Sequence, residues 1–166
     1  VSGAFASISN ISTSLSNNRP SLFQFNNLLF YYNGVSSFLY DGSTTRQIGI
    51  TAPTNAPTQT GTTNGSLVVG AVYSYAYTYY NSVTGAESSP SPLLTTSAVG
   101  ADPNDGFTIG VTAGSATTAD TIRLYRSVAN GAELFLDTTA AIGATSISST
   151  QADAGLSKQI ELDNSR

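Results

Sequence analysis

The side chains that carry most enzyme chemistry are absent from this sequence. It has 166 residues, no cysteine and no histidine, and a formal net charge of −4. Thiol and imidazole catalysis are therefore excluded, and so is a zinc site built on Cys or His. Serine and threonine are abundant, but Lys158 is the single lysine, so no base is evident for a hydroxyl nucleophile.

Paired carboxylates are the remaining catalytic option. Asp102 and Asp105 lie close together, but both belong to a turn-forming Pro/Gly run, where such side chains usually bond to their own backbone. A calcium loop needs a closing Glu at a suitable distance, and none follows. Asp137 and Asp153 occur singly and are expected on the solvated surface. We expect no catalytic residue, metal or cofactor, with a hydrolase built on two converging carboxylates as a further alternative.

Charge and hydropathy also limit the partners. Of the basic residues, only Arg123 and Arg126 lie close together, which is too little for a nucleic-acid surface. No apolar run approaches the roughly 20 residues that span a bilayer. We expect neither nucleic acid nor membrane as a partner. Charged residues are only 10% of the chain, against about 25% in typical soluble proteins, which suits a virion or extracellular protein that assembles into something larger.

The elements that position these residues are predicted to be strands throughout. Residues 1–52 are expected to form a polar arm and a β-meander, with strands at 28–32, 37–40 and 46–50. Asn33-Gly34 and Asp41-Gly42 mark the turns between them. Such a meander is too small to bury both faces alone, so we expect it to pack on a partner or on the rest of the chain. Because the sequence starts with Val and contains no Met, we expect a processed chain or a fragment.

The rest of the chain is predicted to be a Pro/Thr-rich linker, residues 53–66, and an antiparallel β-sandwich, residues 67–166. The first half of the linker could instead be an edge strand. Six or seven short strands at regular spacing are typical of an immunoglobulin- or fibronectin-III-like sandwich. Tyrosines alternate with small residues from Tyr73 to Tyr79. That stripe fits either core packing or an exposed binding face.

Several segments, taken in order, carry a resemblance. They are NNLLFYYNG (26–34), LYDGS (39–43), IGITAP (48–53), VYSYAYTYYN (72–81), TGAESSPSP (84–92), RLYR (123–126), ANG (129–131) and QADAGL (151–156). Together they resemble tailed-bacteriophage virion proteins, of which tail nozzle-type components are the nearest. The resemblance implies a structural role in the virion, in symmetric rings or trimers, without catalysis.

We therefore expect a homo-oligomer that contacts other virion proteins through its arm and meander. The expected interface residues are Phe5, Ile8, Ile11, Leu15, Leu28, Phe30, Tyr31, Tyr32, Phe38 and Tyr40. The alternatives are a capsid decoration protein, or a carbohydrate- or receptor-binding module of a tail fibre that takes a host-surface glycan. The binding module would use Tyr80, Asp102, Asn104 and Asp105.

Overall fold

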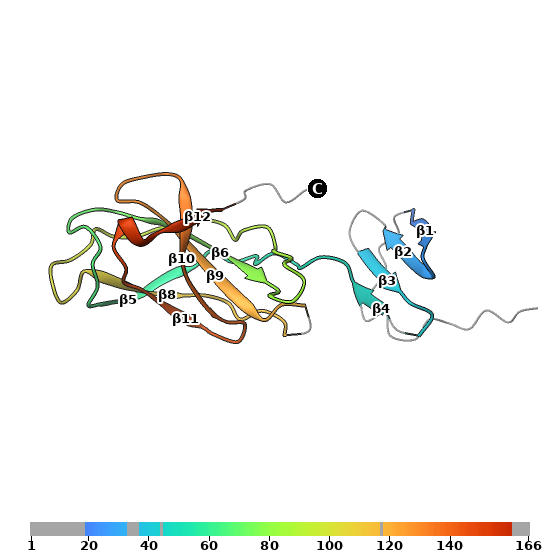
Figure 1. Ribbon diagram of the computed structural model, residues 1–166. Helices are drawn as coiled ribbons and strands as arrows, with labels where there is room; N and C mark the ends of the chain where they lie inside the picture. The colour runs from blue at the N-terminus through green and yellow to red at the C-terminus, as the bar shows by residue number, and fades with distance from the viewer. Residues whose placement is uncertain (1–18, 33–36, 44, 117, 161–166) are drawn as a thin grey trace, which may run out of the picture. The chain divides into compact units, whose positions relative to one another are not determined.

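The computed structural model describes residues 19–32, 37–43, 45–116 and 118–160, and these form an all-β fold (Figure 1). This confirms the predicted fold class. The chain divides into two compact units, Val1–Gly49 and Ile50–Arg166. The expected arm, with Phe5, Ile8, Ile11 and Leu15, lies outside the described residues.

The first unit contains a four-stranded antiparallel meander in the order β1-β2-β3-β4. Its strands are β1 (Ser21–Phe25), β2 (Leu28–Tyr32), β3 (Ser37–Tyr40) and β4 (Thr45–Gln47). The sequence predicted β2 and β3, placed the next strand at 46–50 where β4 already ends at Gln47, and missed β1. Asn26 and Asn27 join β1 to β2 with φ values of 51° and 61°. Positive φ at both positions is the mark of a type I′ hairpin turn, and Asn is one of the few residues that tolerate it.

The second unit consists of a five-stranded sheet, in the order β12-β10-β9-β6-β7, and a three-stranded sheet, in the order β11-β8-β5. All their strand pairs are antiparallel. The strands are β5 (Thr58–Thr63), β6 (Ser74–Tyr80), β7 (Leu94–Thr95), β8 (Gly106–Gly110), β9 (Thr121–Ser127), β10 (Leu134–Ala141), β11 (Ser146–Ser149) and β12 (Ser157–Gln159).

The core lies between these two sheets and is built largely from the tyrosine stripe. Tyr75, Tyr77 and Tyr79 of β6 are buried against Phe107 and Ile109 of β8. Successive side chains of a strand point to opposite faces, so the small residues between the tyrosines lie on the outer face of the sheet. The core-packing interpretation of the stripe is therefore confirmed, and the unit is a β-sandwich. Whether it is specifically immunoglobulin- or fibronectin-III-like stays a prediction.

The segment 53–66, expected to be a linker, contributes a strand to the sandwich. β5 pairs with β8 at the edge of the three-stranded sheet; the segment therefore holds an edge strand, but mostly in its second half and not in the first half as the alternative placed it. Pro53 and Pro57 are buried rather than exposed. The physical reason is that the segment is rich in Thr, a β-branched strand former. Pro57 precedes the strand, where its missing N–H interrupts no ladder.

Side-chain hydroxyls close one edge of β6, where the neighbouring strand β7 is only two residues long. Three residues of the segment 88–96 each donate a backbone N–H to a β6-side carbonyl at 2.9 Å. The hydroxyl of each accepts the N–H of the same tyrosine at 3.0–3.1 Å. The pairs are Ser88 with Tyr79, Ser91 with Tyr77 and Thr96 with Tyr73.

Candidate functional site

The meander formed by β1–β4 is apolar on both of its faces. The register of its strands assigns each side chain to one face. The phenylalanine face, as we name it, consists of Phe23, Phe25, Leu28, Phe30, Tyr32 and Leu39. The tyrosine face consists of Leu22, Leu29, Tyr31, Phe38 and Tyr40. Ring contacts agree with this division, since Phe23 and Phe30 lie 5.9 Å apart and Tyr31 and Phe38 lie 6.2 Å apart.

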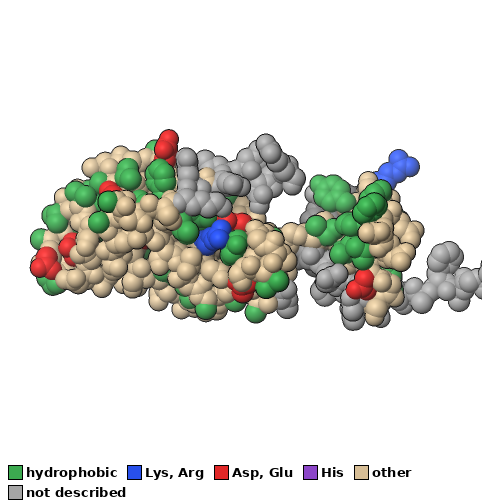
Figure 2. Space-filling model, in the orientation of Figure 1, with side chains coloured by type: hydrophobic (Ala, Val, Ile, Leu, Met, Phe, Trp, Pro, Cys, Tyr) green, Lys and Arg blue, Asp and Glu red, His purple; other side chains and the backbone are tan. Residues whose placement is uncertain are grey.

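Neither face is covered within the described part of the chain. Among residues 19–32, 37–43, 48 and 49, none is buried. Leu22, Phe23 and Tyr32 expose 63%, 62% and 59% of their surface. Figure 2 shows hydrophobic side chains gathered on the visible face of this unit. Contiguous exposed apolar surface of this kind usually marks an interaction site.

The structure distributes the predicted interface residues over both faces. Leu28, Phe30 and Tyr32 lie on the phenylalanine face, whereas Tyr31, Phe38 and Tyr40 lie on the tyrosine face. Sequence reasoning missed the exposed residues of β1, namely Leu22, Phe23 and Phe25. The one signal that could have found them is the pair Asn26-Asn27, a two-residue turn between apolar runs.

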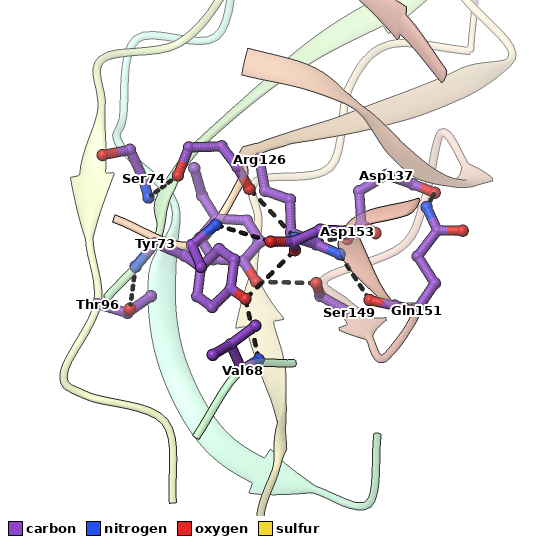
Figure 3. A network of polar contacts seen from close by, with 12 residues as sticks. Val68, Tyr73, Ser74, Thr96, Arg126, Asp137, Ser149, Gln151 and Asp153 are labelled. Atoms are coloured by element: carbon purple, nitrogen blue, oxygen red, sulfur yellow. Dashed lines mark hydrogen bonds and ion pairs between the residues drawn. The ribbon is translucent and has the colours of Figure 1, made fainter. Parts of the chain in front are cut away.

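A network of polar contacts lies inside the sandwich around Arg126 of β9 (Figure 3). The Arg126 guanidinium forms one ion pair with Asp137, Nε to Oδ1 at 3.3 Å, and another with Asp153, Nη1 to Oδ1 at 2.6 Å. It also donates to the carbonyl oxygens of Ser127 and Gln151, at 3.1 and 2.6 Å. Three segments distant in the sequence therefore meet at one buried cation.

Asp137 is buried, so the expectation that it lies on the solvated surface is wrong. It occupies a bulge in β10, where Leu136 pairs with Tyr125 and the next paired residue, Thr138, faces Leu124. Bulges often re-aim a side chain, and here the carboxylate meets the guanidinium of Arg126. Among the described residues, the two carboxylate oxygens of Asp137 accept no hydrogen bond. The ion pair is therefore what compensates the burial of this charge.

Asp153 joins the network from the 3-10 turn that precedes β12. Burial acts to raise its pKa, but the Ala129 N–H at 2.8 Å and the Arg126 guanidinium outweigh this effect. The pKa of Asp153 therefore lies below its ordinary value of 3.8. Tyr73 adds a hydroxyl that donates to Asp153 Oδ1 at 3.2 Å. Burial also raises the pKa of Tyr75, whose hydroxyl lies 2.8 Å from that of Ser149.

A second polar cluster lies on the outer face of the five-stranded sheet. The Glu87 carboxylate accepts from Thr78 Oγ1 at 2.6 Å, from Tyr125 Oη at 2.5 Å and from Arg123 Nη1 at 2.6 Å. Burial acts to raise the pKa of Glu87, but these donors together lower it below 4.5. The Arg123 guanidinium also stacks over the Tyr80 ring, 3.3 Å from its centroid. Tyr80, a residue of the predicted binding face, is thus engaged within its own sheet.

The other residues of that predicted face lie in the loop between β7 and β8. Asp102 Oδ1 accepts from Asn64 Nδ2 at 2.9 Å, and Asn104 Oδ1 accepts from the Thr62 hydroxyl at 2.9 Å. Asp105 Oδ1 accepts from the backbone N–H that follows Asn64, at 2.7 Å. These side chains join the loop before β8 to residues 62–65 at the end of β5. Both segments flank strands of the three-stranded sheet, whereas Tyr80 belongs to the five-stranded sheet. In these contacts Asp102 and Asp105 bond to residues 64 and 65, and not to the backbone of their own turn as the sequence predicted.

Within the ranges that the structure describes, no group of acidic side chains is arranged to hold a metal ion. The same residues include no helix with the length and hydropathy to cross a membrane. The polar clusters at Arg126 and Glu87 join strands to one another, so their contacts serve the fold. Within the described residues, the meander differs from these clusters in that its large apolar side chains Leu22, Phe23, Phe25 and Tyr32 are 59–63% exposed. No protein-family model matches the sequence, and no curated protein matches it either.

Proposed function

We propose that the chain is a non-catalytic structural component of a bacteriophage virion, in the tail or head–tail region. It assembles into a symmetric oligomer through the meander of β1–β4. The observation that supports this best is that both faces of the meander are apolar while none of its side chains with described burial is buried. The phage assignment rests on the resemblance of the sequence to tail proteins.

Covering the exposed surface of the meander would contribute free energy on the same scale as the cost of association. Fully burying one large apolar side chain stabilises a contact by about 1.5–3 kcal/mol. Covering four of them that are now 59–63% exposed therefore contributes roughly 4–7 kcal/mol per copy, which is of the same order as an association cost of about 4–15 kcal/mol. The sandwich acts as the folded body that carries this surface. Its buried cation Arg126 and its outer cation Arg123 are already paired within the chain.

Light scattering of the whole chain over a concentration series tests the proposal. We expect an oligomer of defined mass. Tyr32→Lys should raise the concentration needed for assembly at least tenfold, because it places a charge on the phenylalanine face at a side chain that is 59% exposed. The matched control is Val83→Lys, which changes a side chain of the sandwich that is 90% exposed and should leave the mass unchanged. A wild-type chain that stays monomeric at every concentration would refute the proposal.

A further inference from the structure

The outer edge of β1 is an open strand edge with an unusual composition. β1 stands at the end of the order β1-β2-β3-β4, so one side of its backbone has no paired strand among the described residues. Natural proteins normally protect such edges with Lys, Pro, a bulge or a very short strand. β1 (SLFQF) has five residues, no charge and no proline, and its register with β2 is regular. The opposite edge, β4, has three residues and includes Arg46.

The turn between β1 and β2 fixes which backbone groups point outward. Because the turn has two residues, Phe25 and Leu28 form the hydrogen-bonded pair that closes it. Hydrogen-bonded and non-hydrogen-bonded pairs alternate along an antiparallel ladder. Moving along the ladder away from the turn, the next hydrogen-bonded pair between β1 and β2 is therefore Phe23 with Phe30. The backbone groups of the intervening residue, Gln24, point away from β2.

The same alternation places the backbone N–H and C=O of Leu22 on the outward side. The free edge of β1 thus offers two complete donor–acceptor sets, at Leu22 and Gln24, with Phe23 between them. Pro20 comes next on that side and has no N–H to offer. The open edge therefore has a short, defined length.

We infer that β1 pairs antiparallel with β1 of a second copy of this chain, about a twofold axis at Phe23. Leu22 of one copy then lies opposite Gln24 of the second copy, and the reverse pair repeats the contact. This isologous arrangement uses every outward donor and acceptor of β1. The two Phe23 rings meet across the axis, and both apolar faces of the meander continue from one copy into the other. The inference rests on the proposed function, because it names an edge contact of the meander that assembles; the two apolar faces then continue across the pair and are open to further contacts.

Backbone chemistry selects this register over its neighbours. A shift of two residues toward the N-terminus sets Pro20, which lacks an N–H, opposite Gln24. The opposite shift requires Asn26, whose φ of 51° belongs to the turn and not to a strand. After a shift of one residue, the outward backbone groups of one copy lie opposite residues whose N–H and C=O are already bonded to β2 of their own copy. The twofold axis therefore falls at Phe23.

A single introduced thiol tests the pairing. The chain has no cysteine, so Phe23→Cys gives one reactive group per copy. Directly opposed residues of a non-hydrogen-bonded pair have Cα atoms about 4.5 Å apart, within the range of about 4.4–6.8 Å that a disulfide requires. In the matched control Ser21→Cys, the two thiols stand four positions apart along the paired strands, about 13 Å. On mild oxidation, we expect the Phe23→Cys chain to form a disulfide-linked dimer at least tenfold faster than the control.

A backbone variant provides an independent measurement. Gln24→Pro removes an outward N–H but none that bonds to β2, whereas Gln24→Thr keeps the N–H and serves as its control. We expect Gln24→Pro to raise the concentration needed for dimer formation at least tenfold in light scattering, with near-ultraviolet circular dichroism showing that the fold is kept. Gln24→Thr should behave like the wild type.

The outcomes separate this inference from the proposed function. A wild-type chain that is monomeric throughout overturns both. An oligomer that persists in Gln24→Pro, with equal cross-linking of Phe23→Cys and Ser21→Cys, leaves the assembly role standing. It overturns the β1 pairing and points to contact through the faces, or through residues 5–18, instead.

Discussion

Replacing Arg126 with Met should destabilise the sandwich by about 3–5 kcal/mol, the usual cost of removing one partner of a buried ion pair. The side chains of Arg126 and Asp137 are 0% and 1% exposed. The variant leaves the Asp137 carboxylate in the core without its cation and without a hydrogen bond from the described residues. Met has a long, flexible side chain that fills much of the vacated volume, so the lost charge, not a cavity, dominates.

Two further variants separate the charge from the packing. Adding Asp137→Leu to Arg126→Met removes the stranded carboxylate, and should recover most of the lost stability, because replacing a whole buried pair is often nearly neutral. Asp153 stays hydrated in both variants, since its side chain is 24% exposed. Arg123→Met is the matched control, because its ion pair with Glu87 is 17% exposed on both sides. It should cost less than Arg126→Met, because Glu87 keeps the hydrogen bonds from Thr78 and Tyr125.

Urea unfolding followed by tyrosine circular dichroism is the assay, since the buried core tyrosines report on the sandwich. With a slope of about 2 kcal/mol per molar urea, the loss corresponds to a midpoint lower by about 2 M. A loss in Arg126→Met below about 1 kcal/mol would refute the reasoning. So would a double variant as unstable as the sum of its two single variants, because that would mean the buried charges are not coupled.

Three further predictions follow from the contacts described above. The folded-state pKa values of Glu87 and Asp153 are lowered. The stability that these two carboxylates give the fold is therefore complete above their ordinary pKa values of 4.5 and 3.8, and it is lost as the pH falls further. The urea midpoint should then drop only in acid, and a midpoint level down to pH 2 would contradict this. Burial raises the pKa of Tyr79 to about 12, so its stabilisation holds below pH 10 and is lost as pH rises through 12; phenolate absorbance at pH 11 should show fewer titrated tyrosines in the folded chain than in urea. Gly65→Ala should cost about 1–3 kcal/mol, because its Cβ would lie 2.9 Å from the Asp105 carbonyl oxygen, whereas Gly143→Ala meets nothing within 4 Å and should leave the urea midpoint unchanged.

Local pattern was enough to predict the strands that alternate cleanly. The stripe from Tyr73 to Tyr79 has a strict period of two, and it became the core-facing side of β6. Strand β1 was missed because apolar residues appear on both of its faces, which blurs the alternation that a half-buried strand shows. The sequence analysis placed β5 in a linker because Pro53 and Pro57 favoured an extended connection. Its pairing with β8 is a long-range contact that no local pattern encodes.

The polar clusters were beyond sequence reasoning for a geometric reason. Arg123 and Arg126 form a basic pair in the sequence, but residues three apart in a strand lie on opposite faces. Arg123 therefore pairs with Glu87 on the outer face of the five-stranded sheet, while Arg126 pairs with Asp137 on the face that packs in the core. The partners are distant in the sequence, and a bulge in β10 helps to aim one of them. Similarly, the hydroxyls that close the edge of β6 come from a Ser/Pro stretch that has no strand pattern.

The two edge strands of the meander, β1 and β4, differ in length and charge, and this difference limits how many copies can add by edge pairing. A sheet with two long adhesive edges adds copies at both ends and grows into a fibre. A sheet with one such edge is saturated after a single addition, because twofold pairing uses the edge in both copies at once. β4, with three residues and Arg46, is poorly suited to a second addition. If β1 pairs as inferred above, edge contact alone gives a closed pair, and extending β4 with uncharged residues should convert that pair into a polymerising unit.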